Sequence, residues 1–422
     1  MSTTSAQWTR LSAHESPDDN FIRCLGRGDW SVALSRLVRV FLRSALYAAL
    51  AAVIAVGIVY AMPPGLPFAA SVPNPQDLPL YDFSSWIASG QAAKAGLNPY
   101  LVYPLTYMVR TGNTYVPAPN LNPPISVLAF QPFADVPVNL AFRLWHLVSL
   151  LLFLACVYLL ARSYPRFATR RRILWVFGFA GLWSTLELGQ IYMPMLLALT
   201  GAWLLLRRDH HLAAGILIGI VVAIKPNFLV WPALLLVGGY TTATVGAIVC
   251  TALLSAWPAI VYGPQIYAEW LAVSTGFPGI IFAGNGSLIS LAGRLGGTRV
   301  GIAISALLLI VVAALVWRYR PSVLTLSSLA IVAALLTSPI TWVGYTLFLM
   351  PILFSRSWNL RLRIVAASML VPFPLIYLLF DGAFWRQVVF GSFWLWALLL
   401  LSVVCVEEVR QVRPASVAPH PS

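Results

Sequence analysis

Long apolar stretches determine the fold class of this chain. Stretches of about 15 to 24 residues, close to the ~20 that a helix needs to cross a bilayer, follow one another from Ala45 almost to the C-terminus. Only 9% of the 422 residues are charged, whereas a water-soluble domain carries roughly 25%. The sequence therefore predicts an all-α polytopic membrane protein, with most of its length in membrane helices.

We expect about twelve membrane helices within a single domain that covers residues 44–405. Their approximate ranges are 44–62, 138–161, 173–189, 191–206, 211–225, 228–239, 241–261, 300–317, 322–338, 341–355, 363–380 and 388–405. Several ranges are shorter than ~17 residues, so some are expected to be half-helices or pairs that merge. Residues 1–43 are predicted as a cytoplasmic leader and residues 406–422 as a cytoplasmic tail.

The basic residues predict the orientation. When the connections are assigned alternately to the two sides of the membrane, 20 of the 27 lysines and arginines fall on one side and seven on the other. Cationic residues near helix ends concentrate on the cytoplasmic side. We therefore expect a multi-pass protein of the inner or plasma membrane, with both termini in the cytoplasm and two long extracytoplasmic loops, residues 63–137 and 262–299. The net charge of +14 reflects this orientation and contact with membrane lipids, and it predicts no nucleic-acid partner.

Reactive side chains are scarce on the predicted outer side. The carboxylates there or close to it are Asp77, Asp82, Asp135, Glu187, Glu269 and Asp381, and His146 is the one histidine in an outer-half helix segment. A general base that acts outside must come from this set, unless water or the substrate serves. The four cysteines show no CxxC pair and no metal-ligand spacing, so we expect neither a metal nor another cofactor.

Asp82 has two interpretations. It precedes a helix-like segment, Phe83–Gly96, and an aspartate at that position caps a helix by accepting hydrogen bonds from the first N–H groups. The same carboxylate, at the mouth of the first hydrophobic helix, is also the best candidate for a group that does chemistry. Asp77 and Asp135 stand beside proline-rich turns and are interpreted as turn formers.

Four further charged residues have open roles. Glu187 is close enough to the bilayer to be a functional candidate, and a structural polar bridge between helices is equally compatible with its position. Lys225 ends an apolar helix, where it either extends to the membrane surface or binds a phosphate on the cation-poor side. Arg294 and Arg299, in the second outer loop, are further phosphate candidates, with solvated loop charges as the alternative.

Six motifs occur in an order and spacing that is fairly specific as a set. They are YDFSSWIASGQAAKAGLNPY at 81–100, NPPISVLAFQPF at 122–133, LGQIYMPMLL at 188–197, AAGILIGIVVAIKPNF at 213–228, GNGSLISL at 284–291 and LTSPITWVGY at 336–345. With these motifs the chain resembles glycosyltransferase family 87, the polyprenol-phosphate-mannose-dependent mannosyltransferases of the GT-C superfamily. The resemblance covers roughly residues 44–405.

The resemblance implies a GT-C fold with an extracytoplasmic active site. It implies a sugar donor, mannose in the family, linked to a polyprenyl monophosphate, and a lipid or glycan acceptor. The family's base aspartate matches Asp82, and the lysine of its KP motif matches Lys225. We expect Lys225, with Arg294 or Arg299, to hold the donor phosphate. The residues expected to contact substrate are Tyr81, Tyr100, Glu187, Gln190, Asn285, Ser338, Trp342 and Tyr345.

One carboxylate suffices for such a reaction, because a polyprenyl phosphate leaves without help from a general acid. Asp82 would take the proton of the acceptor hydroxyl as it attacks the anomeric carbon. A single displacement inverts that centre, so a β-linked donor would give an α-linked product. Many family members carry paired histidines after SPxSW, where this chain has Gly344 and Tyr345, and this departure leaves the sugar and the helper of the base open.

Two other classes of function stay as alternatives. A multi-pass lipid or glycolipid flippase or transporter would need no sugar transfer, but it is expected to show two related halves with broken helices in matching positions. No such repeat is visible in the sequence. A lipid-diphosphate-dependent ligase would be expected to carry more outward cations, because it must bind two phosphates.

Overall fold

The computed structural model describes residues 30–61, 81–111, 114–277 and 281–411 of the protein. The chain divides into two compact units, residues 1–52 and 53–422. Helix α2 (Trp30–Ala61) contains the first predicted membrane helix and passes the unit boundary in the sequence. The predictions for Asp77, and for most of the leader and the tail, concern segments outside the described residues.

Among the described residues, three helices are long and apolar enough to cross a membrane. They are α5 (Val138–Ser163), α11 (Thr241–Tyr262) and α14 (Thr298–Tyr319). The pair α17 (Leu360–Ser368) and α18 (Phe373–Phe380) passes the same test together but is bent by 84°. The prediction of about twelve spans is therefore confirmed only in part. Other predicted spans are shorter apolar helices: α8 (Tyr192–Leu206), α9 (His211–Ile224) and α15 (Val323–Thr337).

Three of the predicted ranges each consist of two helical segments, with a break at residues 178–179 in the first range and a continuous change from 3-10 to α-helix in the other two. Range 173–189 consists of α6 (Arg170–Phe177) and α7 (Ala180–Leu188), range 228–239 of η4 (Pro226–Leu229) and α10 (Val230–Val237), and range 341–355 of η6 (Val343–Leu349) and α16 (Met350–Phe354). Proline begins η4 and lies in the first turn of α16, and a proline ends the preceding helix because it lacks an N–H group. The last predicted range is occupied by α19 (Phe384–Val389) and α20 (Phe393–Gln411).

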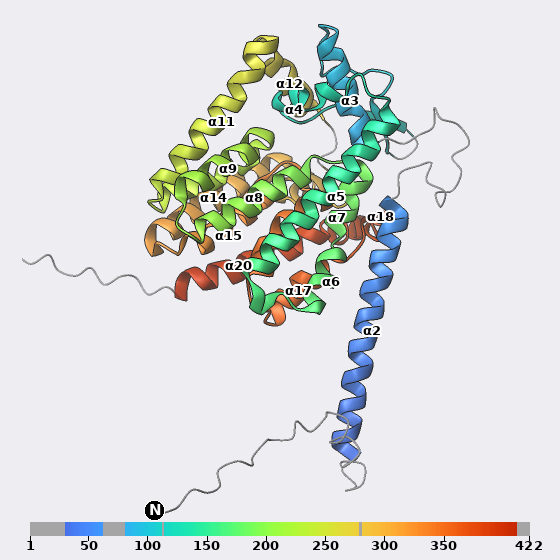
Figure 1. Cartoon of the computed structure of the whole chain (residues 1–422), viewed down its shortest axis with the longest axis vertical. Coiled ribbons are helices and arrows are strands. Elements are labelled where there is room, and N and C mark those ends of the chain that lie inside the picture. Colours follow the sequence, from blue (N-terminus) through green and yellow to red (C-terminus); the bar gives the residue numbers. More distant parts are fainter. Residues whose placement is uncertain (1–29, 62–80, 112–113, 278–280, 412–422) are drawn as a thin grey trace, which may run out of the picture. The chain divides into compact units, whose positions relative to one another are not determined.

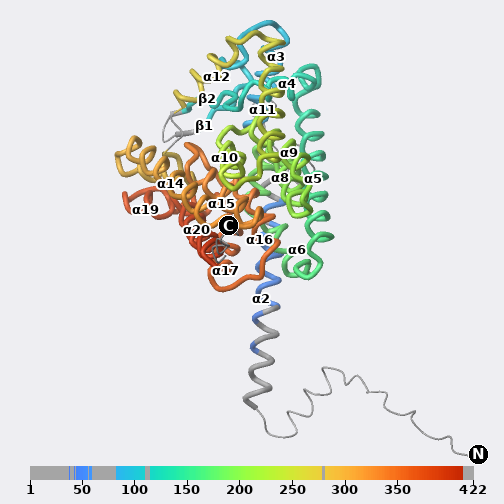
Figure 2. The backbone as a smooth tube through the Cα atoms, turned by 90° about the vertical axis from the view of Figure 1, so that its left-hand side faces the viewer, coloured from blue at the N-terminus to red at the C-terminus, as the bar shows by residue number. Residues whose placement is uncertain are grey.

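Residues 81–111 and 114–133 form a small layer at one end of the second unit, together with α12 (Gln265–Gly276) (Figures 1 and 2). Its elements are α3 (Tyr81–Lys94), β1 (Tyr107–Thr111), β2 (Thr114–Ala118), α4 (Ile125–Phe130) and η2 (Gln131–Phe133). The strands pair antiparallel, with Val109 opposite Val116. The all-α prediction is confirmed for the architecture as a whole, and among the described residues this short hairpin is the exception. Helices α6 and α17 lie at the opposite end of the unit (Figure 1).

Helix α3 buries an apolar face. Phe83, Trp86 and Ile87 stand at the i, i+3, i+4 spacing of one helix face, and each is at most 3% exposed. The ring centroid of Phe83 lies 5.2 Å from that of Phe142 on α5, and that of Trp86 lies 4.7 Å from that of Phe130 on α4. Aromatic packing therefore holds α3 against the membrane helix that follows it in the chain.

Polar side chains on α3 hold the loop residues around it. The Ser85 hydroxyl donates to the carbonyl oxygen of Ala118 at 2.7 Å and accepts from the N–H of Tyr107 at 2.9 Å. The Ser89 hydroxyl donates to the carbonyl oxygen of Pro99 at 2.7 Å. These buried bonds satisfy backbone groups that the short hairpin and the loop between α3 and the hairpin leave open.

Helices α9 and α11 approach closely because small residues line their interface. A Cβ atom at Gly215 would lie 2.2 Å from the carbonyl oxygen of Ala243, and one at Gly219 would lie 2.7 Å from that of Ala247. Glycines four positions apart allow membrane helices this close approach. The contact fixes α9, the helix that Lys225 follows directly.

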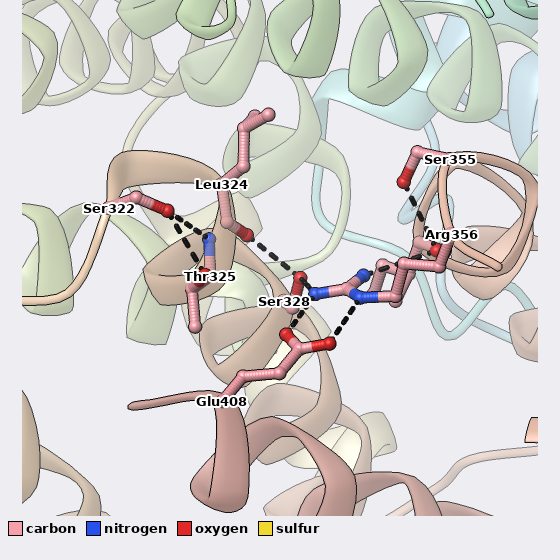
Figure 3. Close-up of polar contacts among 8 residues, drawn as sticks. Ser322, Leu324, Thr325, Ser328, Ser355, Arg356 and Glu408 are labelled. Atoms are coloured by element: carbon pink, nitrogen blue, oxygen red, sulfur yellow. Dashed lines mark hydrogen bonds and ion pairs between the residues drawn. The ribbon is translucent and has the colours of Figure 1, made fainter. Parts of the chain in front are cut away.

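An ion pair connects the C-terminal helix α20 to the core (Figure 3). The Arg356 guanidinium donates to both carboxylate oxygens of Glu408, at 2.9 Å from Nε and 2.7 Å from Nη2. Its Nη2 also donates to the Ser328 hydroxyl on α15 at 2.9 Å, so one side chain joins α15 and α20 to the end of α16. The Arg356 side chain is only 14% exposed, whereas Arg361 and Glu407 form a second pair that is about half exposed.

Candidate active site

Asp82 lies in the first turn of α3 and is partly buried. The helix begins at Tyr81, so Asp82 stands inside it rather than before it, which corrects the predicted segment Phe83–Gly96. The side-chain amide of Gln190 donates a hydrogen bond to its carboxylate. A carboxylate in a first helical turn is also stabilised by the positive end of the helix dipole.

Gln190 reaches Asp82 because of the turn that ends α7. Gly189 adopts a left-handed conformation with φ of +64°, and the N–H of Gln190 then donates to the carbonyl oxygen of Thr185 at 2.9 Å. The indole N–H of Trp145 donates to the Gly189 carbonyl oxygen at 2.7 Å and fixes the turn to α5. Only 4% of Gln190 is exposed, so its amide has a fixed position.

Glycine is required at position 189 for a second reason. A Cβ atom there would lie 2.7 Å from the Cβ of Phe83 and 2.8 Å from the ring of Phe142. The turn after α7 and the first turn of α3 are therefore in direct contact. This contact places Gln190 beside Asp82, the residue that precedes Phe83.

Lys225 comes to the same place from a third segment. It ends α9, and its N–H donates to the carbonyl oxygen of Val221. Its ammonium interacts electrostatically with Asp82. Its Nζ atom also lies 5.5 Å from the ring centroid of Tyr192 and 5.4 Å from that of Tyr345.

The Asp82 carboxyl has a pKa suited to a base at neutral pH. Burial raises its pKa from 3.8 to about 7, and this effect outweighs the lowering by the Lys225 charge and by the Gln190 hydrogen bond. A general base works best when its pKa is close to the working pH, because it is then ionised and still binds a proton well.

Two aromatic rings complete this group of side chains. The ring centroids of Tyr192 and Tyr345 lie 4.9 Å apart, and both residues are at least 96% buried. A Cβ atom at Gly344 would lie 2.7 Å from the Tyr192 ring. Asp82, Gln190, Lys225 and Tyr345, all four predicted from the sequence, are therefore linked by a hydrogen bond, an electrostatic interaction and a cation–π contact. Tyr192 is a neighbour that sequence reasoning missed.

Two other predicted residues form a separate contact between motifs. Asn285 is fully buried, and its side chain accepts from the N–H of Thr341 at 2.9 Å and donates to the carbonyl oxygen of Pro339 at 2.9 Å. The Ser338 hydroxyl donates to the carbonyl oxygen of Ile340 at 2.7 Å. The motif at 284–291 is thus bound to the SPITW segment, and both side chains use their polar groups to shape it.

The two predicted phosphate-binding arginines lie elsewhere. Arg294, on α13 (Leu288–Arg294), is 9% exposed and donates at 2.8 Å to the Ser392 hydroxyl and at 2.8 Å to the carbonyl oxygen of Phe282. Arg299 is exposed in the first turn of α14. No described contact joins either arginine to Asp82 or Lys225, so a phosphate role for them stays a prediction, and Arg294 has a structural role in addition.

The other predicted substrate contacts are spread over the fold. Tyr100 is 1% exposed and donates through its hydroxyl to the carbonyl oxygen of Asn122 at 3.0 Å, as a core residue does. Glu187 is partly buried on α7 and takes part in an interaction. Trp342 is partly exposed just before η6, and Tyr81 begins α3, with its side chain outside the description.

The competing outer carboxylates have simpler roles. Asp135 pairs with Lys94 on the surface, where both side chains are at least half exposed. Glu269 is partly buried on α12, and Asp381 is exposed after α18. Among the described residues, no group of three or more His, Cys, Asp or Glu side chains could hold a metal ion.

Comparison with known proteins identifies the family of the chain. The chain matches the model of glycosyltransferase family 87 over residues 120–339, a region that contains Gln190, Lys225 and Asn285 but begins after Asp82. No curated protein sequence and no solved structure matches the chain. Because the family match covers more than half of the 422 residues, the chain belongs to glycosyltransferase family 87 and is a glycosyltransferase.

Proposed function

We propose that this glycosyltransferase transfers a sugar from a polyprenyl-monophosphate donor to a lipid or glycan acceptor outside the cytoplasm, with Asp82 as the general base. Mannose is the sugar that the family resemblance favours. One observation carries the proposal: Asp82, Gln190 and Lys225 come from three separate segments, and the Gln190 amide and the Lys225 charge both act on the Asp82 carboxylate. A carboxylate with a pKa of about 7 and a cation beside it are the two groups that such a transfer needs.

The reaction is a single displacement. The acceptor hydroxyl oxygen attacks the anomeric carbon while its proton passes to Asp82. The bond between the anomeric carbon and the phosphate oxygen breaks, and the polyprenyl phosphate leaves with the electron pair. The anomeric centre inverts, so a β-linked donor yields an α-linked product, and the base contributes about 10²- to 10⁴-fold to the rate.

Lys225 is the group we assign to the donor phosphate. Negative charge grows on the phosphate as it departs, and a fixed cation beside the base stabilises that charge. Within the described part of the chain, Lys225 is the cation that interacts with Asp82. A single cation suits one phosphate, which supports a monophosphate donor over a lipid diphosphate.

The orientation is part of the proposal. We assign the layer of α3, the hairpin, α4 and α12 to the extracytoplasmic side. The uneven distribution of the basic residues supports this assignment. The arginine-rich start of α6, Arg170 to Arg172, belongs to a helix at the other end of the same unit (Figure 1).

A panel of radiolabelled polyprenyl-phosphate sugars, offered to membranes that carry the protein, tests this function. We expect the wild type to transfer one of the sugars, and Asp82→Asn to transfer it about 10²- to 10⁴-fold more slowly. Asp135→Asn is the matched control, because it removes an exposed outer carboxylate and should keep full activity. Undiminished transfer by Asp82→Asn would overturn the base assignment. Lipid movement without transfer from any donor would favour a flippase.

A further inference from the structure

Tyr192 occupies the place beside Gly344. A Cβ atom at position 344 would lie 2.7 and 2.8 Å from two carbons of the Tyr192 ring, closer than a real side chain tolerates. Tyr192 is only 3% exposed, so its ring cannot move out into solvent to make room. Any residue larger than glycine at 344 therefore requires Tyr192 to move.

The same ring lies beneath the Lys225 ammonium. The Nζ atom is 5.5 Å from the Tyr192 centroid and 5.4 Å from the Tyr345 centroid, so the two tyrosines share one cation. Both distances fall within the range of a cation–π interaction, which is stronger where water is excluded. Tyr192 also interacts electrostatically with Asp82.

Packing alone does not account for this arrangement. Lys225 is partly buried at the end of α9. A lysine that only ends a membrane helix would extend its charge to the membrane surface, whereas this ammonium lies over two buried rings. A lysine side chain has four rotatable bonds, and it binds a phosphate weakly unless something holds its charge in place. Two tyrosine faces provide such a support, and they provide it beside the candidate base.

We propose that Tyr192 is a positioning residue, which together with Tyr345 holds the Lys225 ammonium where the phosphate of a lipid-linked sugar departs. Position 344 is glycine because a larger side chain there would overlap the Tyr192 ring. This inference rests on the proposed function and deepens it. Glycine at position 344 leaves the space that the Tyr192 ring occupies.

Steady-state kinetics with the active polyprenyl-phosphate sugar test the role of the ring. Tyr192→Ala should raise the KM for the donor by roughly 3- to 30-fold with a smaller change in kcat. Tyr192→Phe keeps the ring and should keep the donor KM within about twofold. Phe153→Ala, which removes a buried ring of α5 that packs on Phe177, is the matched control and should lower thermal stability without changing the donor KM.

A double-mutant cycle tests the role of Gly344. Gly344→Ala should raise the donor KM and lower the unfolding temperature in the wild-type background, because its methyl group displaces Tyr192. In the Tyr192→Ala background the same change should have little effect on either quantity, because the ring is already gone. Gly344→Ala alone can be too unstable to purify, and recovery of folded protein in the double variant then serves as the readout.

Three results separate the possible failures. Additive effects of Gly344→Ala and Tyr192→Ala would overturn the inference, and so would a donor KM that Tyr192→Ala leaves at the wild-type value. In both cases the wild type still transfers sugar, so the proposed function stands. A wild type that transfers sugar from no polyprenyl monophosphate would overturn the proposed function, and the inference with it.

Discussion

Asp82 and Gln190 stand 108 positions apart in the chain, and the amide of Gln190 donates a hydrogen bond to the carboxylate of Asp82. The position of the candidate base therefore depends on two helix ends, the first turn of α3 and the turn after α7. The Gln190 amide can also orient the carboxylate while leaving its second oxygen for the acceptor hydroxyl. Changes in either turn should be measurable as changes in transfer.

The rate should depend on the ionisation of Asp82. Its pKa is about 7, so the carboxyl is protonated below that pH and cannot accept a proton from the acceptor hydroxyl. We expect kcat/KM to rise about tenfold per pH unit below pH 7 and to level off above it. Transfer measured from pH 5.5 to 8.5 checks this, with Asp135→Asn as a variant that should show the same curve. A rate independent of pH over this range would contradict it.

The free energy of unfolding should also change with pH because Asp82 ionises. The folded carboxyl keeps its proton up to about pH 7, whereas the unfolded chain loses it near the ordinary value of 3.8. The folded state thus binds more protons between these values, and ionisation of Asp82 lowers the free energy of unfolding as the pH rises through this window. Asp82→Asn removes that loss. We expect its unfolding temperature in detergent, relative to the wild type, to be higher at pH 8 than at pH 5.

An equal difference at both pH values would contradict this prediction. Asp135→Asn is again the control, because its carboxyl is exposed and pairs with Lys94 on the surface. The prediction separates two roles for Asp82. If the Asp82 carboxylate were purely structural, Asp82→Asn should make the protein less stable at pH 8. A catalytic carboxylate is retained for activity although it makes the folded protein less stable.

Gly189→Ala should disturb both stability and transfer. Its methyl group would meet Phe83 and Phe142 at 2.7 and 2.8 Å, and its φ of +64° is strained for alanine. Gly96→Ala is the matched control, because Gly96 has a similar φ of +72° but no atom within 4 Å of the position that a methyl group would take. We expect Gly96→Ala to cost about 1 kcal/mol of folding free energy and to leave transfer unchanged.

Gly189→Ala should cost more than Gly96→Ala in thermal unfolding, and it should lower transfer about 10²-fold, because the clash moves Gln190 away from Asp82. Similar behaviour of the two variants would mean that backbone strain alone matters at position 189. The contact between the turn after α7 and α3 would then have no part in placing the base.

The ion pair between Arg356 and Glu408 should matter far more than the exposed pair between Arg361 and Glu407. Arg356→Ala leaves the partly buried Glu408 carboxylate without its partner, which costs about 3–5 kcal/mol. Arg361→Ala breaks a surface pair and should cost about 0–1 kcal/mol. Thermal unfolding of both variants in detergent compares them, and equal losses would contradict the prediction.

Membrane helices were the most predictable part of the fold. Long uninterrupted apolar runs predicted 138–161 and 241–261, and the helices observed are Val138–Ser163 and Thr241–Tyr262. The sequence predicted that some short ranges are half-helices, but it did not indicate that 173–189 is one of them, because apolar composition is the same on both sides of a break. The hairpin at 107–118 was missed, since two five-residue strands in a proline-containing loop leave little periodic pattern.

The candidate site could be predicted from the sequence only in part. Asp82 and Lys225 stood out because charges are rare in this sequence, and the electrostatic interaction between them is what a shared site would show. Tyr192 was missed because one aromatic residue in an apolar run looks like an ordinary core residue. Only its spatial contacts with Gly344 and Lys225 distinguish it.

The close approach of Tyr192 to Gly344 limits the order in which these two positions can change over time. A histidine at 344 cannot enter while the ring at 192 is in place, because the first side-chain carbon already overlaps it. The ring must be lost first, and that intermediate would hold Lys225 against one tyrosine instead of two. The aromatic ring at 192 and a larger residue at 344 therefore exclude each other, so a substitution at one position sets what the other can accept.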